Sequence, residues 1–151
     1  MDATNMVESS MSVQTTPPYQ NATDLLHEAP ESFVTAVDSQ LNGSLDCLGI
    51  YTPRSLDVLF AAGEFSAQKD AGQLPLIAKD ASIEIAFGDT AREHLYELGQ
   101  FAYAMDSYTD GSVLRVGLTE QTGLLVVGTF SAAAVENVLS TVDTHLRIER
   151  S

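Results

Sequence analysis

The stretch that decides the fold runs from Phe101 to Phe130 and reads FAYAMDSYTDGSVLRVGLTEQTGLLVVGTF. At its start, apolar residues alternate with small or polar ones, as they do in a half-buried β-strand. Two turn sequences rich in Gly, Asp and Thr follow, and each of them leads into another apolar run, at 113–118 and at 124–130. The last run is apolar on both faces, which is typical of a central strand covered by helices. The stretch therefore predicts a three-stranded antiparallel meander.

A short helix is predicted directly before this meander. Thr90 can cap its start, and Glu93 three residues later completes a capping-box pattern. Leu95 and Leu98 are expected to face the core, and Gly99 marks the end of the helix.

The remaining regular elements are one helix near each end of the chain and one more hairpin. Apolar residues at helical spacing predict a helix from Pro30 to a stop at Asn42–Gly43, and a final helix capped by Ser131. Two apolar runs joined by a turn, at 45–51 and 56–61, predict a pair of strands.

In chain order these elements read α-β-β-α-β-β-β-α, which predicts an α+β fold. The expected architecture is a five-stranded antiparallel sheet sandwiched by helices. Residues 62–89 either add a short strand around 83–87 or form a loop over the core. We expect a single α+β domain over residues 30–151. The polar residues 1–29 cannot bury enough apolar surface to offset their ordering entropy, so we expect a disordered or weakly ordered tail there.

This order of elements resembles the roadblock/LC7-type, profilin-like fold. More narrowly, the stretch from Arg92 to Phe130 and the hairpin at 51–60 resemble a family of small, uncharacterised haloarchaeal proteins. The resemblance covers about residues 33–146 and brings no catalytic residues. It implies a fold, a salt-rich cytoplasm and a regulatory role, because roadblock-like proteins act on GTPases or assembly complexes through sheet edges and helix faces.

Acidity is the strongest signal in the composition. The chain has 21 acidic and seven basic residues, only two of them lysine, and a formal net charge of -14. Such an excess normally disfavours compactness, but in molar salt the Debye length falls to about 3 Å and the repulsion largely disappears. The composition therefore predicts a halophilic, acidic protein of the cytoplasm.

The same composition narrows the classes of partner. Direct nucleic-acid binding needs clustered Lys and Arg, whereas the five arginines are scattered along the chain. A membrane span needs about 20 consecutive apolar residues, and no run approaches that length. The first twenty residues contain no Lys or Arg and no apolar segment typical of a signal peptide. We therefore expect no direct nucleic-acid contact, no membrane insertion and a cytoplasmic location.

No constellation of residues indicates catalysis. His27, His94 and His145 are widely spaced, and we expect His94 to face solvent and His145 to lie on the polar flank of the last helix. Asp106 and Asp110 flank a turn and are interpreted as a hydrated acidic turn rather than a cation site. Phosphate-binding loops and nucleophile elbows are missing from the sequence. The prediction is a protein that is not an enzyme, with no metal and no cofactor.

Two single residues have competing interpretations. Cys47 stands among leucines and an isoleucine, so we expect a buried core residue rather than a reactive thiol. Arg115 lies in mid-strand, and we expect it at an exposed rim of the sheet with a surface salt bridge. If a helix instead covers that face, Arg115 must pair with a carboxylate, because a buried unpaired charge is costly.

The segment 100–105 supplies the functional hypothesis. In the fold that the sequence resembles, this strand lies at the sheet edge and pairs with its twin in dimers. An exposed edge is normally protected by Lys, Pro or a bulge, yet residues 100–105 carry no charge. Either residues 62–89 cover this edge or a partner does, and we favour dimerisation. The candidate interface residues are Tyr96, Phe101, Tyr103 and Met105.

These observations predict a non-enzymatic regulatory or protein-interaction module, acting as a homodimer and through a protein partner. The alternative is a small-molecule-sensing domain, with a pocket between the sheet and residues 62–89. An enzyme is the least favoured class, since no nucleophile, base or metal set is clustered.

Overall fold

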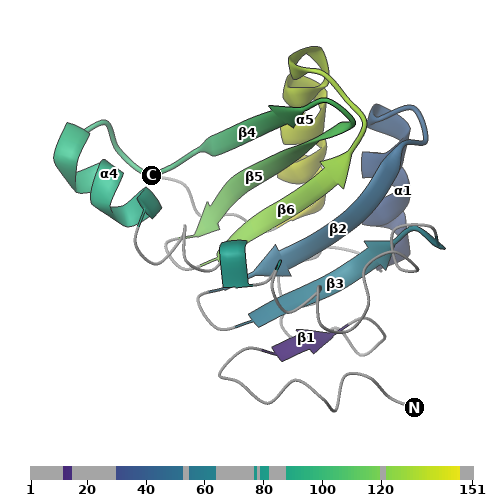
Figure 1. Ribbon diagram of the computed structural model, residues 1–151, viewed down its shortest axis with the longest axis horizontal. Coiled ribbons are helices and arrows are strands. Elements are labelled where there is room, and N and C mark those ends of the chain that lie inside the picture. Colours follow the sequence, from purple (N-terminus) through teal and green to yellow (C-terminus); the bar gives the residue numbers. More distant parts are fainter. Residues whose placement is uncertain are drawn as a thin grey trace.

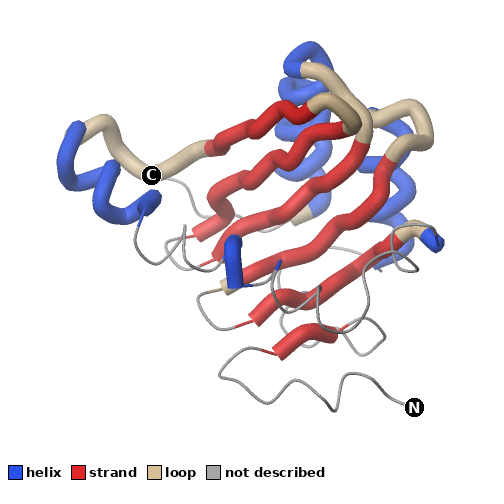
Figure 2. Tube along the Cα trace, viewed as in Figure 1, coloured by secondary structure: helices blue, strands red, loops and turns tan. Residues whose placement is uncertain are grey.

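The computed structural model describes residues 12–14, 30–52, 55–63, 77, 79–81, 88–119 and 122–146. Regular structure accounts for most of these residues (Figures 1 and 2). The elements are β1 (Ser12–Gln14), α1 (Pro30–Gln40), β2 (Leu45–Tyr51), β3 (Ser55–Ala61), α4 (Thr90–Tyr96), β4 (Tyr103–Tyr108), β5 (Gly111–Thr119), β6 (Thr122–Gly128), the short 3-10 helix η3 (Ala132–Ala134) and α5 (Val135–His145).

The strands form one sheet in the order β1-β3-β2-β6-β5-β4. Strands β2 to β6 pair antiparallel throughout, which confirms the predicted five-stranded antiparallel sheet and its meander. The short strand β1 adds to the outer side of β3 in parallel orientation. It comes from the segment expected to be disordered or weakly ordered, and its pairing was not anticipated; the rest of 1–29 lies outside the described residues.

Helices α1 and α5 lie against each other on one face of the sheet, behind it in Figure 1. Their apolar stripes point at the sheet as the helical spacing predicted, and Phe33 and Val37 of α1 are buried. Val138 and Val142 of α5 are fully buried in the same layer. Burial of these apolar side chains stabilises the packing of the two helices on the sheet, by roughly 25 cal/mol for each Å² of apolar surface removed from water.

The opposite face of the sheet has its own, smaller apolar cluster. Cys47, Tyr51, Val58 and Leu125 are buried there, and Ala81 packs over them. Cys47 is therefore the core residue that the sequence predicted. The possible strand at 83–87 lies outside the described residues.

Helix α4 differs from the expectation of a helix packed on the sheet. It stands beyond the first residues of β4, to the left of the sheet in Figures 1 and 2. Leu95 and Leu98, predicted to face the core, are 71% and 85% exposed. The predicted capping box is also wrong, because the residue at the N-cap is Asp89 and its side chain makes no capping bond. The helix ends at Tyr96 with Glu97 as a left-handed C-cap, which is earlier than the predicted stop at Gly99. Gly99 also has left-handed backbone, with φ 94°.

Candidate functional site: an open sheet edge and the pocket beside it

Strand β4 is the outermost strand of the sheet and pairs with β5 alone among the described residues. The Gly117 N–H donates to the Ala102 carbonyl at 2.8 Å, and Tyr103 lies opposite Val116. In an antiparallel ladder this register directs the backbone groups of even-numbered β4 residues toward β5. The N–H and C=O groups of Tyr103, Met105 and Ser107 therefore point away from the sheet, along the open edge.

The strand begins later than the sequence suggested. Residues 100–102 precede it, and Asp106 belongs to it, so the edge carries one acidic side chain. Tyr103 and Met105 lie opposite Val116 and Leu114 and project to the face that α1 and α5 cover. Met105 packs partly against that core, whereas Tyr103 is 47% exposed.

The other two candidate interface residues lie elsewhere. Tyr96, at the end of α4, is 61% exposed, and Phe101 sits in the connection between α4 and β4. Both line a pocket rather than the helix-covered face of the sheet. The four candidates therefore do not form one cluster. Tyr103 and Met105 project to the face that α1 and α5 cover, whereas Tyr96 and Phe101 line the pocket on the opposite side.

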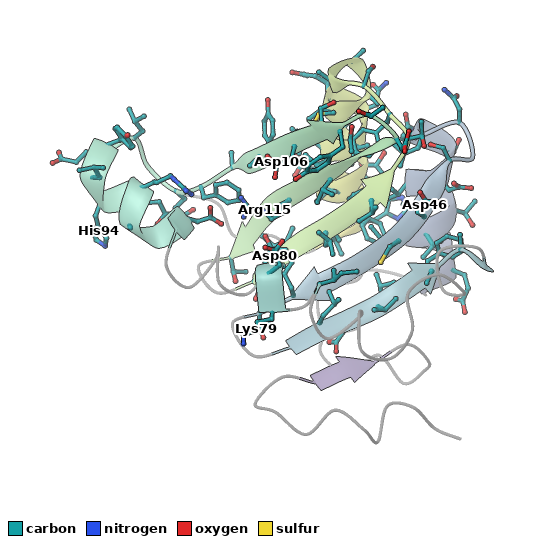
Figure 3. The ribbon with its side chains drawn as sticks, viewed as in Figure 1. Asp46, Lys79, Asp80, His94, Asp106 and Arg115 are labelled. Carbon is teal, nitrogen blue, oxygen red and sulfur yellow. The ribbon has the colours of Figure 1, made fainter. Side chains whose placement is uncertain are left out.

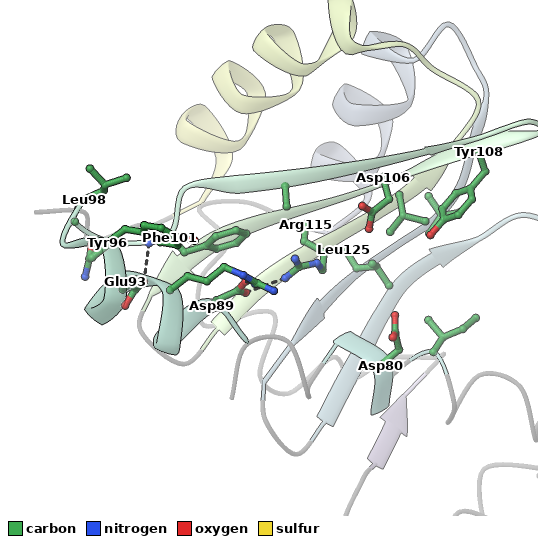
Figure 4. A pocket seen from close by; sticks show the side chains of 17 residues that line it. Asp80, Asp89, Glu93, Tyr96, Leu98, Phe101, Asp106, Tyr108, Arg115 and Leu125 are labelled. Carbon is green, nitrogen blue, oxygen red and sulfur yellow. Dashed lines mark hydrogen bonds and ion pairs between the residues drawn. The ribbon is translucent and has the colours of Figure 1, made fainter. Parts of the chain in front are cut away.

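The pocket lies between α4 and the face of the sheet opposite α1 and α5 (Figure 4), and its volume is about 930 Å³. Its floor is made by side chains of β4, β5 and β6, and the residues Ile77 and Asp80 lie at its other side. The described side chains on this sheet face include Asp106 and Arg115, both labelled in Figure 3. The floor residues are Ala104, Asp106, Tyr108, Val113, Arg115, Leu125 and Val127.

A buried ion pair joins α4 to this floor. Nη1 of Arg115 donates to Oδ2 of Asp89 at 2.8 Å, and both side chains are at most one-tenth exposed. Nη1 of Arg92, an α4 residue whose side chain is 59% exposed, lies 3.5 Å from the other oxygen of Asp89. The guanidinium of Arg115 also lies over the ring of Phe101, 5.2 Å from its centroid. The expectation of an exposed rim position for Arg115 was wrong, and the paired buried alternative holds.

The balance of forces on Arg115 follows from this geometry. Burial disfavours its charged form, but the hydrogen bond to Asp89 and the electrostatic interactions with Tyr51 and Asp89 outweigh that effect. The pKa of Arg115 is consequently raised above its ordinary value. Arg115 is therefore a permanently charged group in the pocket wall, with Asp89 as its counter-ion.

The connection after α4 is held by backbone contacts. The Phe101 N–H donates to Oε2 of Glu93 at 2.6 Å. The Glu93 carboxylate, which the sequence predicted in a capping box, therefore binds the connection after the helix instead. The Phe101 carbonyl lies directly over Gly117 of β5, where a Cβ would clash with it. These contacts fix the end of α4 beside the first residues of β4.

The other residues considered in the sequence take structural positions. His94 is exposed and points away from the pocket, as expected (Figure 3). His145 is partly buried, with its ring 5.8 Å from that of Phe33, so the polar-flank expectation was wrong. Asp106 and Asp110 are both exposed. Within the described ranges, no three His, Cys, Asp or Glu side chains gather as metal ligands.

Two features of this site escaped the sequence analysis. They are the exposure of Leu95 and Leu98, and the ion pair between Asp89 and Arg115. The leucine spacing matched a core-facing helix, and spacing cannot show whether the helix reaches a sheet. The pairing joins residues 26 positions apart, which is beyond local sequence patterns. None of the helices in the described ranges is long and apolar enough to span a bilayer.

Comparison with solved structures shows the fold. A structure described as MglB with a tetrameric arrangement is similar at a TM-score of 0.57 and 16% identity, covering 80% of this chain and 90% of that one. Myxococcus xanthus MglB is similar at a TM-score of 0.55 and 10% identity, with coverage of 78% and 90%. A roadblock/LC7 domain from Streptomyces avermitilis matches at 0.46 and 15% identity, with coverage of 71% and 94%.

The architecture is thus α+β, and the fold is similar to that of the two MglB structures. No curated protein matches the sequence. A protein family does match it, over residues 31–148. The chain belongs to the family described as Domain of unknown function (DUF7522).

Proposed function

We propose that this protein is a non-enzymatic regulatory or interaction module that works as a homodimer, with the edge of β4 as the meeting line of the two copies. The observation that carries the proposal is the open edge itself. β4 has six residues, a single acidic side chain and no Lys or Pro, so its outward backbone groups are not protected against pairing.

The exposed apolar side chains around this edge support the same assignment. In the part of the chain that the structure describes, the large hydrophobic side chains with high exposure lie on α4, directly after it and on β4, at Leu95, Tyr96, Leu98, Tyr103 and Tyr108. Scattered apolar side chains are normal on a surface, but a group on two consecutive elements is typical of an interaction site. An antiparallel pairing of β4 with its twin would bring these side chains near the partner.

The fold agrees with association. Roadblock-like neighbours include an MglB structure described as tetrameric, and that assembly is a property of MglB. For this chain we infer, without assigning a tetramer, that copies of it associate and then present a surface to another protein. The excess of acidic residues suggests that this takes place in the salt-rich cytoplasm of a halophile, where like charges on two copies are screened.

The proposal is tested by placing charges on the suspected interface. The double substitution Leu95→Glu with Leu98→Glu adds one carboxylate on α4 and one just after it, at side chains that make little contact with their own chain. Sedimentation equilibrium in about 2 M KCl should then show a dissociation constant at least about tenfold higher than that of the unmodified protein. The matched control is Asn137→Glu with Ser140→Glu, which adds the same charges at the same spacing on exposed positions of α5. Equal dimerisation of both variants would overturn the assignment.

The pocket favours a second candidate function, a small-molecule-sensing domain. A space of about 930 Å³ beside a sheet falls in the size range of ligand sites, and Ile77 and Asp80 of the region 62–89 line it. A pocket at this place is what the alternative hypothesis requires. Soaking the protein with a set of small organic probes and following the methyl resonances of Leu125 and Val127 tests it. Saturable shifts at these two residues would support a ligand site.

A further inference from the structure

The charges that line the pocket are unevenly distributed. Among the described lining residues, two are arginines and four carry carboxylates, namely Arg92, Arg115, Asp80, Asp89, Glu93 and Asp106. Both arginines engage the same carboxylate, Asp89, at 3.5 Å and 2.8 Å. Glu93 accepts the Phe101 N–H at 2.6 Å. The positive charge of the pocket is therefore concentrated near α4 and already neutralised in part.

The two remaining carboxylates, Asp80 and Asp106, lie at the other end. Figure 4 shows their side chains pointing into the space from opposite sides, with Tyr108 beside Asp106. No ion pair joins either of them to another residue in the described part of the chain. Asp106 shares one row across the sheet with Val113 and Val127. The next row on the same face holds Arg115 and Leu125. This end of the pocket therefore presents negative potential next to apolar surface.

The aromatic residues of the lining point to the same ligand chemistry. Tyr96, Phe101 and Tyr108 all line the pocket, and aromatic faces attract organic cations. Phe101 already carries the guanidinium of Arg115 over its ring, which shows that the site accommodates this type of contact. Carboxylates together with aromatic rings disfavour an anion and favour a positively charged ligand with an apolar body.

We propose that the pocket binds a small organic cation, an amine on an aromatic or aliphatic body, with its charge held between Asp80 and Asp106 and its body on Val113, Leu125 and Val127. The assignment rests on the second candidate function, the sensing pocket, and names its ligand class. It is independent of whether the protein dimerises.

The test uses three probes that share one apolar body: 3-phenylpropylamine, 3-phenylpropanol and 3-phenylpropanoate. Each is titrated into the full-length protein while the methyl resonances of Leu125 and Val127 are followed. The amine should bind about three- to fivefold more tightly than the alcohol, because each exposed carboxylate contributes modestly to a close charge pair. The carboxylate should bind most weakly.

Variants of the two carboxylates test where the positive charge of the ligand binds. Asp80→Asn with Asp106→Asn should reduce the affinity for the amine to that of the alcohol and leave alcohol binding unchanged. The control Asp110→Asn with Glu136→Gln removes the same formal charge at exposed positions outside the lining and should keep the preference for the amine. Because all four positions are exposed, their thermal transitions should match that of the unmodified protein.

The remaining outcomes distinguish failure of the cation assignment from failure of the sensing function. Equal binding of amine and alcohol at Leu125 and Val127 would overturn the cation assignment and keep the pocket as a ligand site. Preferred binding of the carboxylate, lost in Arg92→Met, would also overturn it and assign an anion site at α4. Absence of shifts with all three probes would overturn the sensing function itself.

Discussion

Arg115 on strand β5 and Asp89 at the start of α4 form a buried ion pair with 2.8 Å between Nη1 and Oδ2. Arg92 also pairs with Asp89, but both of these residues belong to the α4 segment, so this second contact does not reach the sheet. The pair therefore positions α4, and with it the pocket and the exposed leucines, relative to the sheet.

Removing one partner of this ion pair should destabilise the fold. Asp89→Leu leaves the Arg115 charge buried without its counter-ion, and we expect a loss of about 3 kcal/mol in the free energy of unfolding. Replacing both partners, with Arg115→Met in the same chain, should recover most of that loss because no charge is then left buried. Denaturant unfolding measures the free energy of unfolding of the single and the double variant. Arg92→Met, at an exposed side chain, should change stability by less than about 1 kcal/mol; equal losses in all three variants would contradict the account.

The two sides of β4 should respond differently to proline. Ser107 directs its N–H outward, so Ser107→Pro should leave the fold intact and abolish pairing with a second copy. Asp106 bonds toward β5, opposite Val113, so Asp106→Pro should leave a β5 acceptor without its donor. We expect that variant to lose about 1–3 kcal/mol of stability. Circular dichroism melting and sedimentation distinguish the two effects, and a dimeric Ser107→Pro variant would rule out edge pairing.

Gly123 should not tolerate a side chain. A Cβ at this position would overlap the ring of Tyr51, which is fully buried and cannot move aside easily. We expect Gly123→Ala to cost about 1–3 kcal/mol, as overpacking of a core does. Gly63→Ala is the control, because nothing lies within 4 Å of the Cβ there. Equal melting temperatures of the two variants would show that the sheet adjusts around Tyr51.

The buried thiol of Cys47 makes stability depend on alkaline pH. Burial, with a smaller contribution from Asp46, raises its pKa from 9.0 to about 12. The unfolded chain therefore loses this proton near pH 9 while the folded chain keeps it, so the contribution to stability is present below pH 9 and is lost as pH rises toward 12. The slope is at most about 1.4 kcal/mol per pH unit.

Comparing Cys47→Ala with the unmodified protein isolates this effect, since tyrosines and lysines titrate equally in both. The difference in unfolding free energy between the two should shrink as pH rises above 9. A thiol reagent added at pH 8 should label Cys47 only after unfolding. Rapid labelling of the native protein would contradict the burial of this side chain.

The sequence predicted the fold well where local patterns decide it. Alternation in 101–130 and the helical stripes of α1 and α5 encode which faces are buried, and these faces were identified correctly. Position in the tertiary structure is not encoded in this way. Leu95 on α4 and Leu98 just after it have core-like spacing but are exposed. Arg115 is buried in a pair with Asp89, which lies 26 residues earlier. The pocket also depends on such distant contacts, so only its general location could be predicted.

The association of two copies along β4 is the central claim, and light scattering coupled to size-exclusion chromatography in about 2 M KCl tests it most directly. The account predicts a mass of twice 16.2 kDa that falls toward 16.2 kDa only on dilution. A mass of 16.2 kDa at every concentration would contradict it.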